Sequence, residues 1–150
     1  MRPLLTLLQG LLILLSIAVL GALVWLPLTE GRAQGLPLLE VYTDPFILYG
    51  ALIAVLGLLL LYHIFQLLEH GKHGTLGSAA ALHTLRSIRW KALLCSILLV
   101  LAGLYIRLYH HPADDPAGFL ALCVFLIVCC GGGALGAWWL EKSIGKNSLE

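Results

Sequence analysis

The 150-residue chain is too apolar for an ordinary water-soluble domain: 60% of its residues are hydrophobic and only 11% are charged, whereas typical soluble domains are about 25% charged. The net charge of +1 supplies no broadly basic surface, so we expect no direct binding of nucleic acid. The composition therefore predicts an integral membrane protein.

Four near-continuous apolar runs each reach the roughly 20 residues that a helix needs to cross about 30 Å of hydrocarbon. They cover residues 4–26, 45–68, 90–109 and 117–140, and a polar connection at 69–89 separates the second run from the third. The first run is longer than the core of a secretory signal, so we expect it to be retained as a helix. We predict one all-α domain over residues 1–150, an integral membrane four-helix bundle made of two transmembrane helical hairpins.

The second and fourth runs share a design. Asp44–Pro45 and Asp115–Pro116 each place an N-cap acceptor before a proline at the first helical position. Each helix then ends in Leu-Glu, at Glu69 and Glu141. Duplication of an ancestral hairpin explains this pattern. The alternative is that any span running toward the same side of the membrane tends to begin with a cap and end with a charge.

The polar connection carries three of the chain's six histidines and a group of basic residues. Within it, the glycines of "GKHG" (residues 71–74) predict a break, and Ser78 predicts the N-cap of a helix that continues into the third span. The apolar residues of this helix fall on one face: Ala81, Leu85, Ile88 and Ala92. The candidate contact residues on its polar surface and just before it are Lys72, Arg86, Arg89 and Lys91.

Basic residues at a membrane surface meet anionic lipid phosphates, at about 1 kcal/mol each. Anchoring of the third span is thus the simplest role for this group, and the same face also suits a cytoplasmic protein partner. Of the nine Lys and Arg residues, only Arg32 and Arg107 fall in the two alternate loops. Because basic residues near span ends stay in the cytoplasm, we expect both termini and the 69–89 connection on that side.

Small residues spaced by four predict close helix packing on the fourth span. The candidate packing residues are Cys129, Gly132, Gly133, Gly136 and Ala137. Such a face suits another helix of this chain, a homo-oligomer or a larger membrane complex. We expect the four cysteines (Cys95, Cys123, Cys129 and Cys130) to pack as small apolar residues, because the sequence contains no CxxC pair.

Polar groups that are candidates for chemistry lie near the end of the second span. His63, His70 and His73 are the metal-ligand candidates, and His63 is also a candidate haem ligand or proton carrier. A packed, hydrogen-bonded histidine is the simpler interpretation of His63, since no opposed ligand at similar depth is visible. We therefore expect neither a bound metal nor a cofactor.

The stretch "GTLGSAAALHTLRSIRWKALLCSILLVLAG" (residues 74–103) contains the pattern Leu-Arg-x-Ile-x-Trp at the start of the third span. The matching residues are Leu85, Arg86, Ile88 and Trp90, and the tail "LGAWWLEKSIGKNSLE" adds a closing Leu-Glu with lysines. In these features the chain resembles a bacterial family of small four-span membrane proteins of unknown function. Members are often encoded beside a short helix-turn-helix regulator, so the resemblance implies a partner of that kind.

We interpret the sequence as a non-catalytic regulatory or accessory protein of the bacterial inner membrane, which contacts lipids and a protein partner through its cytoplasmic connection. Two alternatives from other classes stay open. A small transporter or channel subunit predicts a polar group at mid-membrane, and a membrane redox or metal-binding protein predicts a ligand at His63.

Overall fold

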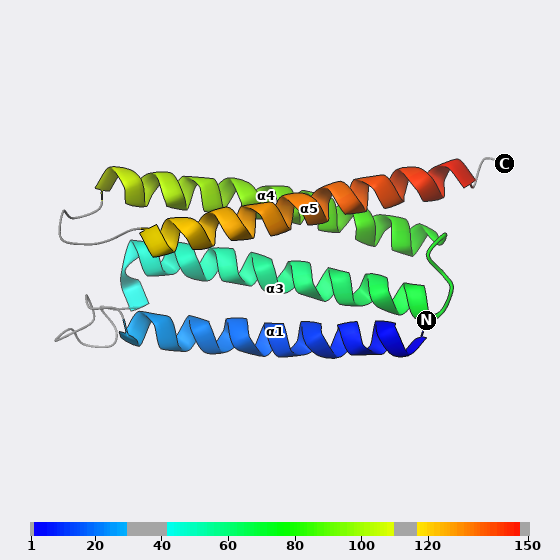
Figure 1. Ribbon diagram of the computed structural model, residues 1–150, viewed down its shortest axis with the longest axis horizontal. Helices are drawn as coiled ribbons and strands as arrows, with labels where there is room; N and C mark the ends of the chain where they lie inside the picture. The colour runs from blue at the N-terminus through cyan, green and yellow to red at the C-terminus, as the bar shows by residue number, and fades with distance from the viewer. Residues whose placement is uncertain (1, 30–41, 110–116, 148–150) are drawn as a thin grey trace. The chain divides into compact units, whose positions relative to one another are not determined.

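The structure, a computed structural model, describes residues 2–29, 42–109 and 117–147. Its long helices are α1 (Arg2–Thr29), α3 (Pro45–Lys72), α4 (Ala79–Tyr109) and α5 (Ala117–Asn147). All four are long and apolar enough to cross a membrane. The chain divides into two compact units, residues 1–72 and 73–150, and each holds one helical hairpin (Figure 1). The prediction of an all-α membrane protein made of two transmembrane hairpins is confirmed.

In the first hairpin, α1 packs against α3. Asp44 caps α3, because its side-chain Oδ1 accepts the Phe46 N–H at 2.8 Å, and Pro45 follows as the first helical residue. No residue of α3 is buried. Both helices are rich in leucine, whose bulk holds two backbones apart, so this hairpin packs loosely.

In the second hairpin, α4 packs more closely against α5. Apart from the adjacent pair Thr84 and Leu85, the buried positions of α4 recur in steps of three and four, the spacing of a helix–helix seam. They are Ala81, Thr84, Leu85, Ile88, Ala92, Cys95, Leu99 and Ala102. On α5 the buried residues are Cys123, Ala134 and Ala137. Small side chains on both helices let the two backbones approach.

The connection between α3 and α4 is shorter than the sequence indicates. Helix α3 continues through Gly71 to Lys72, so the expected break at residues 71–74 is wrong for its first half. The cost of a helical glycine is about 1 kcal/mol, and the contacts of Lys72 with Gln9 and Glu69 offset it. The chain then turns at Gly74, whose φ of 69° suits glycine.

Helix α4 begins where the sequence predicts. Ser78 Oγ accepts the Ala81 N–H at 3.2 Å, which confirms the N-cap. The predicted apolar face is also confirmed, because all four of its residues are at most 3% exposed: Ala81, Leu85, Ile88 and Ala92. Residues 79–89, predicted as part of the connection, therefore extend α4 beyond its apolar span.

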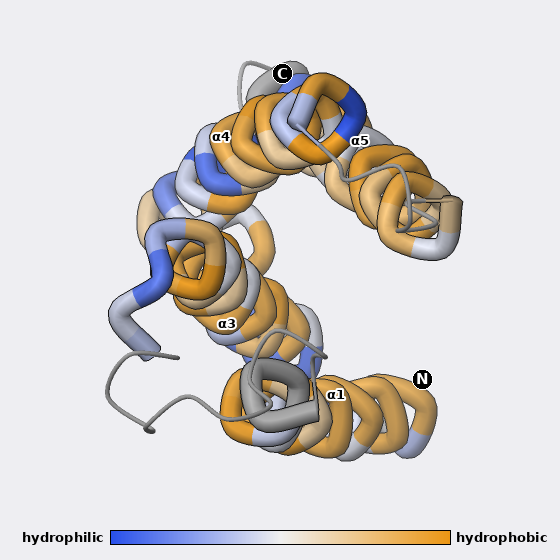
Figure 2. Tube along the Cα trace, turned by 90° about the vertical axis from the view of Figure 1, so that its left-hand side faces the viewer, coloured by the Kyte–Doolittle hydropathy of each residue, from blue (hydrophilic) through white to orange (hydrophobic). Residues whose placement is uncertain are grey.

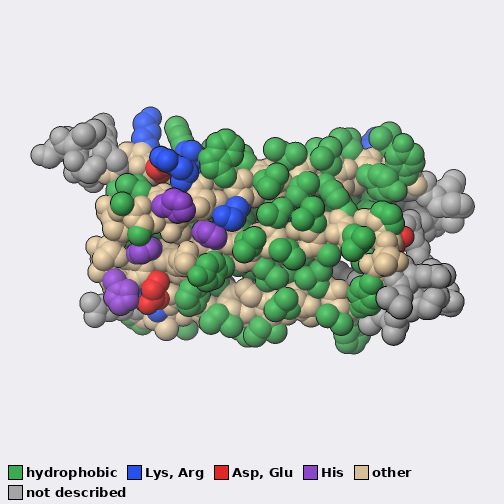
Figure 3. Space-filling view, turned by 180° about the vertical axis from the view of Figure 1, so that it is seen from behind, with side chains coloured by type: hydrophobic (Ala, Val, Ile, Leu, Met, Phe, Trp, Pro, Cys, Tyr) green, Lys and Arg blue, Asp and Glu red, His purple; other side chains and the backbone are tan. Residues whose placement is uncertain are grey.

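Apolar residues dominate the length of every helix (Figure 2). On the surface in Figure 3, hydrophobic side chains cover the middle of the helices, whereas the histidine side chains and most of the basic and acidic ones lie toward the left-hand end. This distribution matches helices that bury their central turns in lipid and expose their ends to water.

Candidate functional site

The second hairpin gathers charged residues from both of its helices at one end. Helix α4 contributes Arg86 and Arg89 from its first three turns, and the last turns of α5 contribute Glu141. Arg86 Nη2 donates to Glu141 Oε1 at 3.2 Å, and Arg89 Nη1 donates to Oε2 at 2.8 Å. Each arginine thus takes its own carboxylate oxygen. We call this group the Arg–Glu–Arg cluster.

Exposure differs within the cluster. The Glu141 and Arg89 side chains are 19% and 25% exposed, whereas that of Arg86 is 66% exposed. One carboxylate faces two guanidinium groups, so the cluster keeps a formal charge of +1. A half-buried carboxylate orients both arginines through charge-assisted hydrogen bonds, and Arg86 still presents most of its surface to a ligand.

Further basic and aromatic side chains surround the cluster. Arg89 Cζ lies 6.0 Å from the centre of the Trp90 ring, and Lys142 Nζ lies 5.3 Å from the centre of the Trp138 ring. Trp90, Trp138 and Trp139 are all exposed. Exposed tryptophans beside basic residues are typical of the membrane–water interface. The cluster, Lys91, Lys142 and these tryptophans form what we call the basic end of the second hairpin.

The first hairpin has a polar end with different chemistry. Gln9 is only 5% exposed, and its Nε2 donates to Glu69 Oε2 at 2.6 Å. Lys72 Nζ in turn donates to Gln9 Oε1 and lies 3.9 Å from Glu69 Oε2. Lys72, a predicted contact residue, is therefore held within its own hairpin and is half-buried.

The candidate metal ligands do not converge. His63 Nδ1 lies 2.7 Å from the Leu59 carbonyl oxygen one turn earlier, and its ring meets the edge of Tyr62. His70 lies further along α3, and His73 follows the helix. Within residues 2–29, 42–109 and 117–147, no group of three or more His, Cys, Asp or Glu side chains is placed to hold a metal ion.

The predicted packing residues of α5 divide between two surfaces. Ala137 is buried, as is Cys123, which was expected to pack as a small apolar residue; Ala134 is buried too, although the spacing did not predict it. The exposed residues are Cys129, Gly132, Gly133 and Gly136, and a Cβ built on any of these glycines would meet nothing within 4 Å. On α5, packing inside this hairpin thus uses alanine and cysteine, and a role for the glycine face in contacts with another chain stays a prediction.

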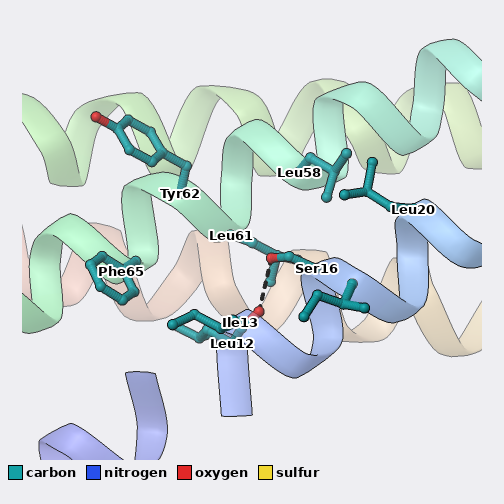
Figure 4. A pocket seen from close by; sticks show the side chains of 9 residues that line it. Leu12, Ile13, Ser16, Leu20, Leu58, Leu61, Tyr62 and Phe65 are labelled. Carbon is teal, nitrogen blue, oxygen red and sulfur yellow. Dashed lines mark hydrogen bonds between the residues drawn. The ribbon is translucent and has the colours of Figure 1, made fainter. Parts of the chain in front are cut away.

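An apolar groove of about 320 Å³ lies between α1 and α3 (Figure 4). Its lining includes Leu20, Leu58 and Phe65. The Ser16 hydroxyl, drawn with its hydrogen bond in Figure 4, donates to the Leu12 carbonyl at 2.8 Å. The Tyr62 hydroxyl accepts from Gln66 Nε2. Because the lining is apolar and both hydroxyls are already hydrogen-bonded, the groove offers no constellation for catalysis.

Comparison with known proteins gives a family and no activity. No curated protein and no solved structure matches the chain. Residues 27–142 match a family described as "Protein of unknown function (DUF2975)". The match includes α3, α4 and the part of α5 that reaches Glu141, and so it contains the whole Arg–Glu–Arg cluster. The chain therefore belongs to this family of unknown function.

Proposed function

We propose that the protein is a non-catalytic regulatory or accessory component of the bacterial inner membrane. Its basic end binds an anionic group, carried by a cytoplasmic protein partner or by a membrane lipid. The observation that supports this proposal is the pairing of Arg86 and Arg89 with Glu141. The carboxylate pre-orients two guanidinium groups without neutralising both, and pre-organised arginines are suited to binding carboxylate or phosphate.

The proposed orientation rests on the distribution of basic residues. Seven of the nine Lys and Arg residues fall at the two chain ends and around the connection between α3 and α4. The positive-inside rule then assigns these parts to the cytoplasm. A cytoplasmic partner such as a small helix-turn-helix regulator, which the family resemblance implies, reaches the basic end from that side.

A transporter or channel subunit is the second candidate, and the polar network that the buried Gln9 forms with Glu69 and Lys72 favours it. Polar groups inside a membrane often mark a substrate or ion pathway. Here the network lies near one end of its hairpin, and its members satisfy one another. Ion or solute flux through the purified protein in liposomes, abolished by Gln9→Leu, would establish this candidate instead.

The main test compares the wild-type protein with the Arg86→Gln/Arg89→Gln variant after purification in a mild detergent. Native mass spectrometry measures binding of an anionic phospholipid, phosphatidylglycerol, and proteomic mass spectrometry identifies proteins that co-purify. We expect the variant to lose several-fold in phosphatidylglycerol affinity or to lose its specific partner, because two oriented cations are gone.

Arg107→Gln is the matched control, since Arg107 is a basic residue at the opposite end of α4. It should retain wild-type binding. Equal lipid affinity and equal partner recovery in the double variant and the wild type would contradict the proposed role of the basic end.

A further inference from the structure

Each helix of the second hairpin carries charged and aromatic side chains at the same spacing, positions i, i+3 and i+4, which share one face of a helix. The residues are Arg86, Arg89 and Trp90 on α4, and Trp138, Glu141 and Lys142 on α5. The ion pairs of Glu141 with both arginines bring the two faces together. Together they form a two-helix surface on which three cations face one carboxylate.

This surface lies at the boundary of the apolar spans. The apolar span of α4 starts beside Trp90, and that of α5 ends at Leu140. Trp90 and Trp138 are both exposed at this level, and exposed tryptophans mark the depth of lipid headgroups. An anionic group bound here therefore lies at the level of lipid phosphates rather than in the water beyond them.

Glu141 uses only part of the hydrogen-bonding capacity of the two arginines. It accepts from Nε and Nη2 of Arg86 and from Nη1 of Arg89. Arg86 Nη1 and Arg89 Nη2 make no hydrogen bond to any residue that the structure describes. Since each guanidinium group has five N–H donors, the pair can bind a phosphate while it keeps its contacts with the carboxylate.

Lys142 supplies a separate positive charge. Its side chain is exposed, and its Nζ lies 5.3 Å from the centre of the Trp138 ring, one turn closer to the apolar span. With Lys142, the formal charge of the surface rises from +1 to +2. A lipid with one phosphate compensates half of this charge, whereas a lipid with two phosphates compensates all of it.

We propose that this surface binds a phospholipid with two phosphate groups, one held by Arg86 and Arg89 and the other by Lys142. Basic sites between transmembrane helices suit headgroups of this kind, and the flanking tryptophans suit the boundary between headgroup and acyl chains. The inference rests on the proposed function of the basic end, and it selects a lipid over a cytoplasmic protein as the ligand.

The test measures lipid binding to the full-length protein in mild detergent by native mass spectrometry. The probes are cardiolipin, phosphatidylglycerol and phosphatidylethanolamine, which carry two, one and no net negative charges. We expect cardiolipin to bind about fivefold more tightly than phosphatidylglycerol, because one more basic side chain meets a phosphate. Phosphatidylethanolamine should bind most weakly.

Variants assign the two phosphates to their cations. Arg86→Gln/Arg89→Gln should weaken binding of both anionic lipids about tenfold or more. Lys142→Gln should weaken cardiolipin about fivefold and phosphatidylglycerol less than about twofold, because only the second phosphate loses its partner. It leaves the ion pairs of Glu141 in place, so it tests the proposal even if the double variant unfolds. Arg107→Gln is the matched control and should bind all three lipids as the wild type does.

Three results would overturn the inference. The first is equal affinity for cardiolipin and phosphatidylglycerol, and the second is an equal loss of both lipids in Lys142→Gln. The third is displacement of cardiolipin by soluble glycerol phosphate, which would identify a free phosphate as the ligand. If the double variant keeps its lipid affinity and loses a co-purifying protein, the lipid inference fails while the proposed function stands. If it loses neither, both fail.

Discussion

Glu141 is the residue on which the geometry of the basic end depends. Its side chain is 19% exposed and contacts two arginines of the neighbouring helix. Exposed ion pairs contribute about 0–1 kcal/mol, whereas removing one partner of a more buried pair leaves a charge without compensation. Arg86 is exposed enough for solvent to screen its share, so the contact with Arg89 carries most of the energy.

We predict that Glu141→Gln lowers the free energy of unfolding by about 1 kcal/mol, because neither arginine keeps its charged partner. Thermal unfolding in detergent should show a melting temperature lower by about 2–4 °C. Lys142→Gln is the control, since Lys142 is exposed and its ammonium group lies 5.3 Å from the centre of the Trp138 ring, and it should change stability by less than about 0.5 kcal/mol. Equal effects of the two substitutions would contradict the structural role of Glu141.

Gln9 is the buried polar residue of α1, and its amide contacts Glu69 and Lys72. We predict that Gln9→Leu costs about 1 kcal/mol of unfolding free energy, because two polar groups of α3 lose a hydrogen-bond partner. Gln66→Leu removes an amide that donates to an exposed hydroxyl one turn away on the same helix, so it should cost less. Thermal unfolding of both variants measures the difference, and the reverse order would refute the importance of this network.

At the scale of elements, the two hairpins differ in how closely their helices approach. Helix α3 has no buried residue, whereas α4 has eight. The difference follows from side-chain size, because α1 and α3 meet through leucines, whereas alanine and cysteine alternate with Leu85, Ile88 and Leu99 along the seam of α4 with α5. The exposed glycines of α5 take no part in this packing.

We predict opposite outcomes for two adjacent positions on α5. Ala134→Leu overfills the seam and should cost about 1–3 kcal/mol. Gly133→Ala meets nothing within 4 Å and should be neutral or stabilise the helix by up to about 1 kcal/mol. Thermal unfolding distinguishes them; a destabilised Gly133→Ala variant with a smaller oligomeric mass would instead indicate that the glycine face binds a second copy.

The sequence predicted the elements well because their signals are local. Continuous apolar length defines the spans, and the caps at Asp44 and Ser78 need only the next three residues. The amphipathic start of α4 was likewise visible from its spacing. By contrast, the ion pairs of Glu141 and the contacts of Gln9 with Glu69 and Lys72 join residues far apart in the chain. Their recognition requires the register of two packed helices, which periodicity within one helix does not provide.

One prediction from the sequence, the duplication of an ancestral hairpin, involves residues that the structure does not describe. Asp115 and Pro116, which support the idea of a duplicated hairpin, lie outside the described residues. Counted along the sequence, Glu69 follows Asp44 by 25 residues and Glu141 follows Asp115 by 26. Each also contacts a polar side chain from the first helix of its own hairpin, Gln9 or Arg86. Duplication of an ancestral hairpin stays a prediction.

At the scale of the whole molecule, four apolar helices indicate a protein that crosses the membrane four times. An even number of crossings places both termini on one side, and the connection between α3 and α4 on that side too. The basic residues then decide which side it is. Every functional proposal for the basic end depends on this orientation.

Site-directed labelling tests the orientation most directly. Two single-cysteine variants are made in a background in which all four native cysteines are replaced by serine. The first carries Leu76→Cys, in the connection between α3 and α4. The second carries Gln34→Cys, between the first two spans. A membrane-impermeant maleimide is applied to intact spheroplasts and to permeabilised ones. We predict that Gln34→Cys is labelled in intact spheroplasts and Leu76→Cys only after permeabilisation. Labelling of Leu76→Cys from outside would contradict the assignment of the basic end to the cytoplasm.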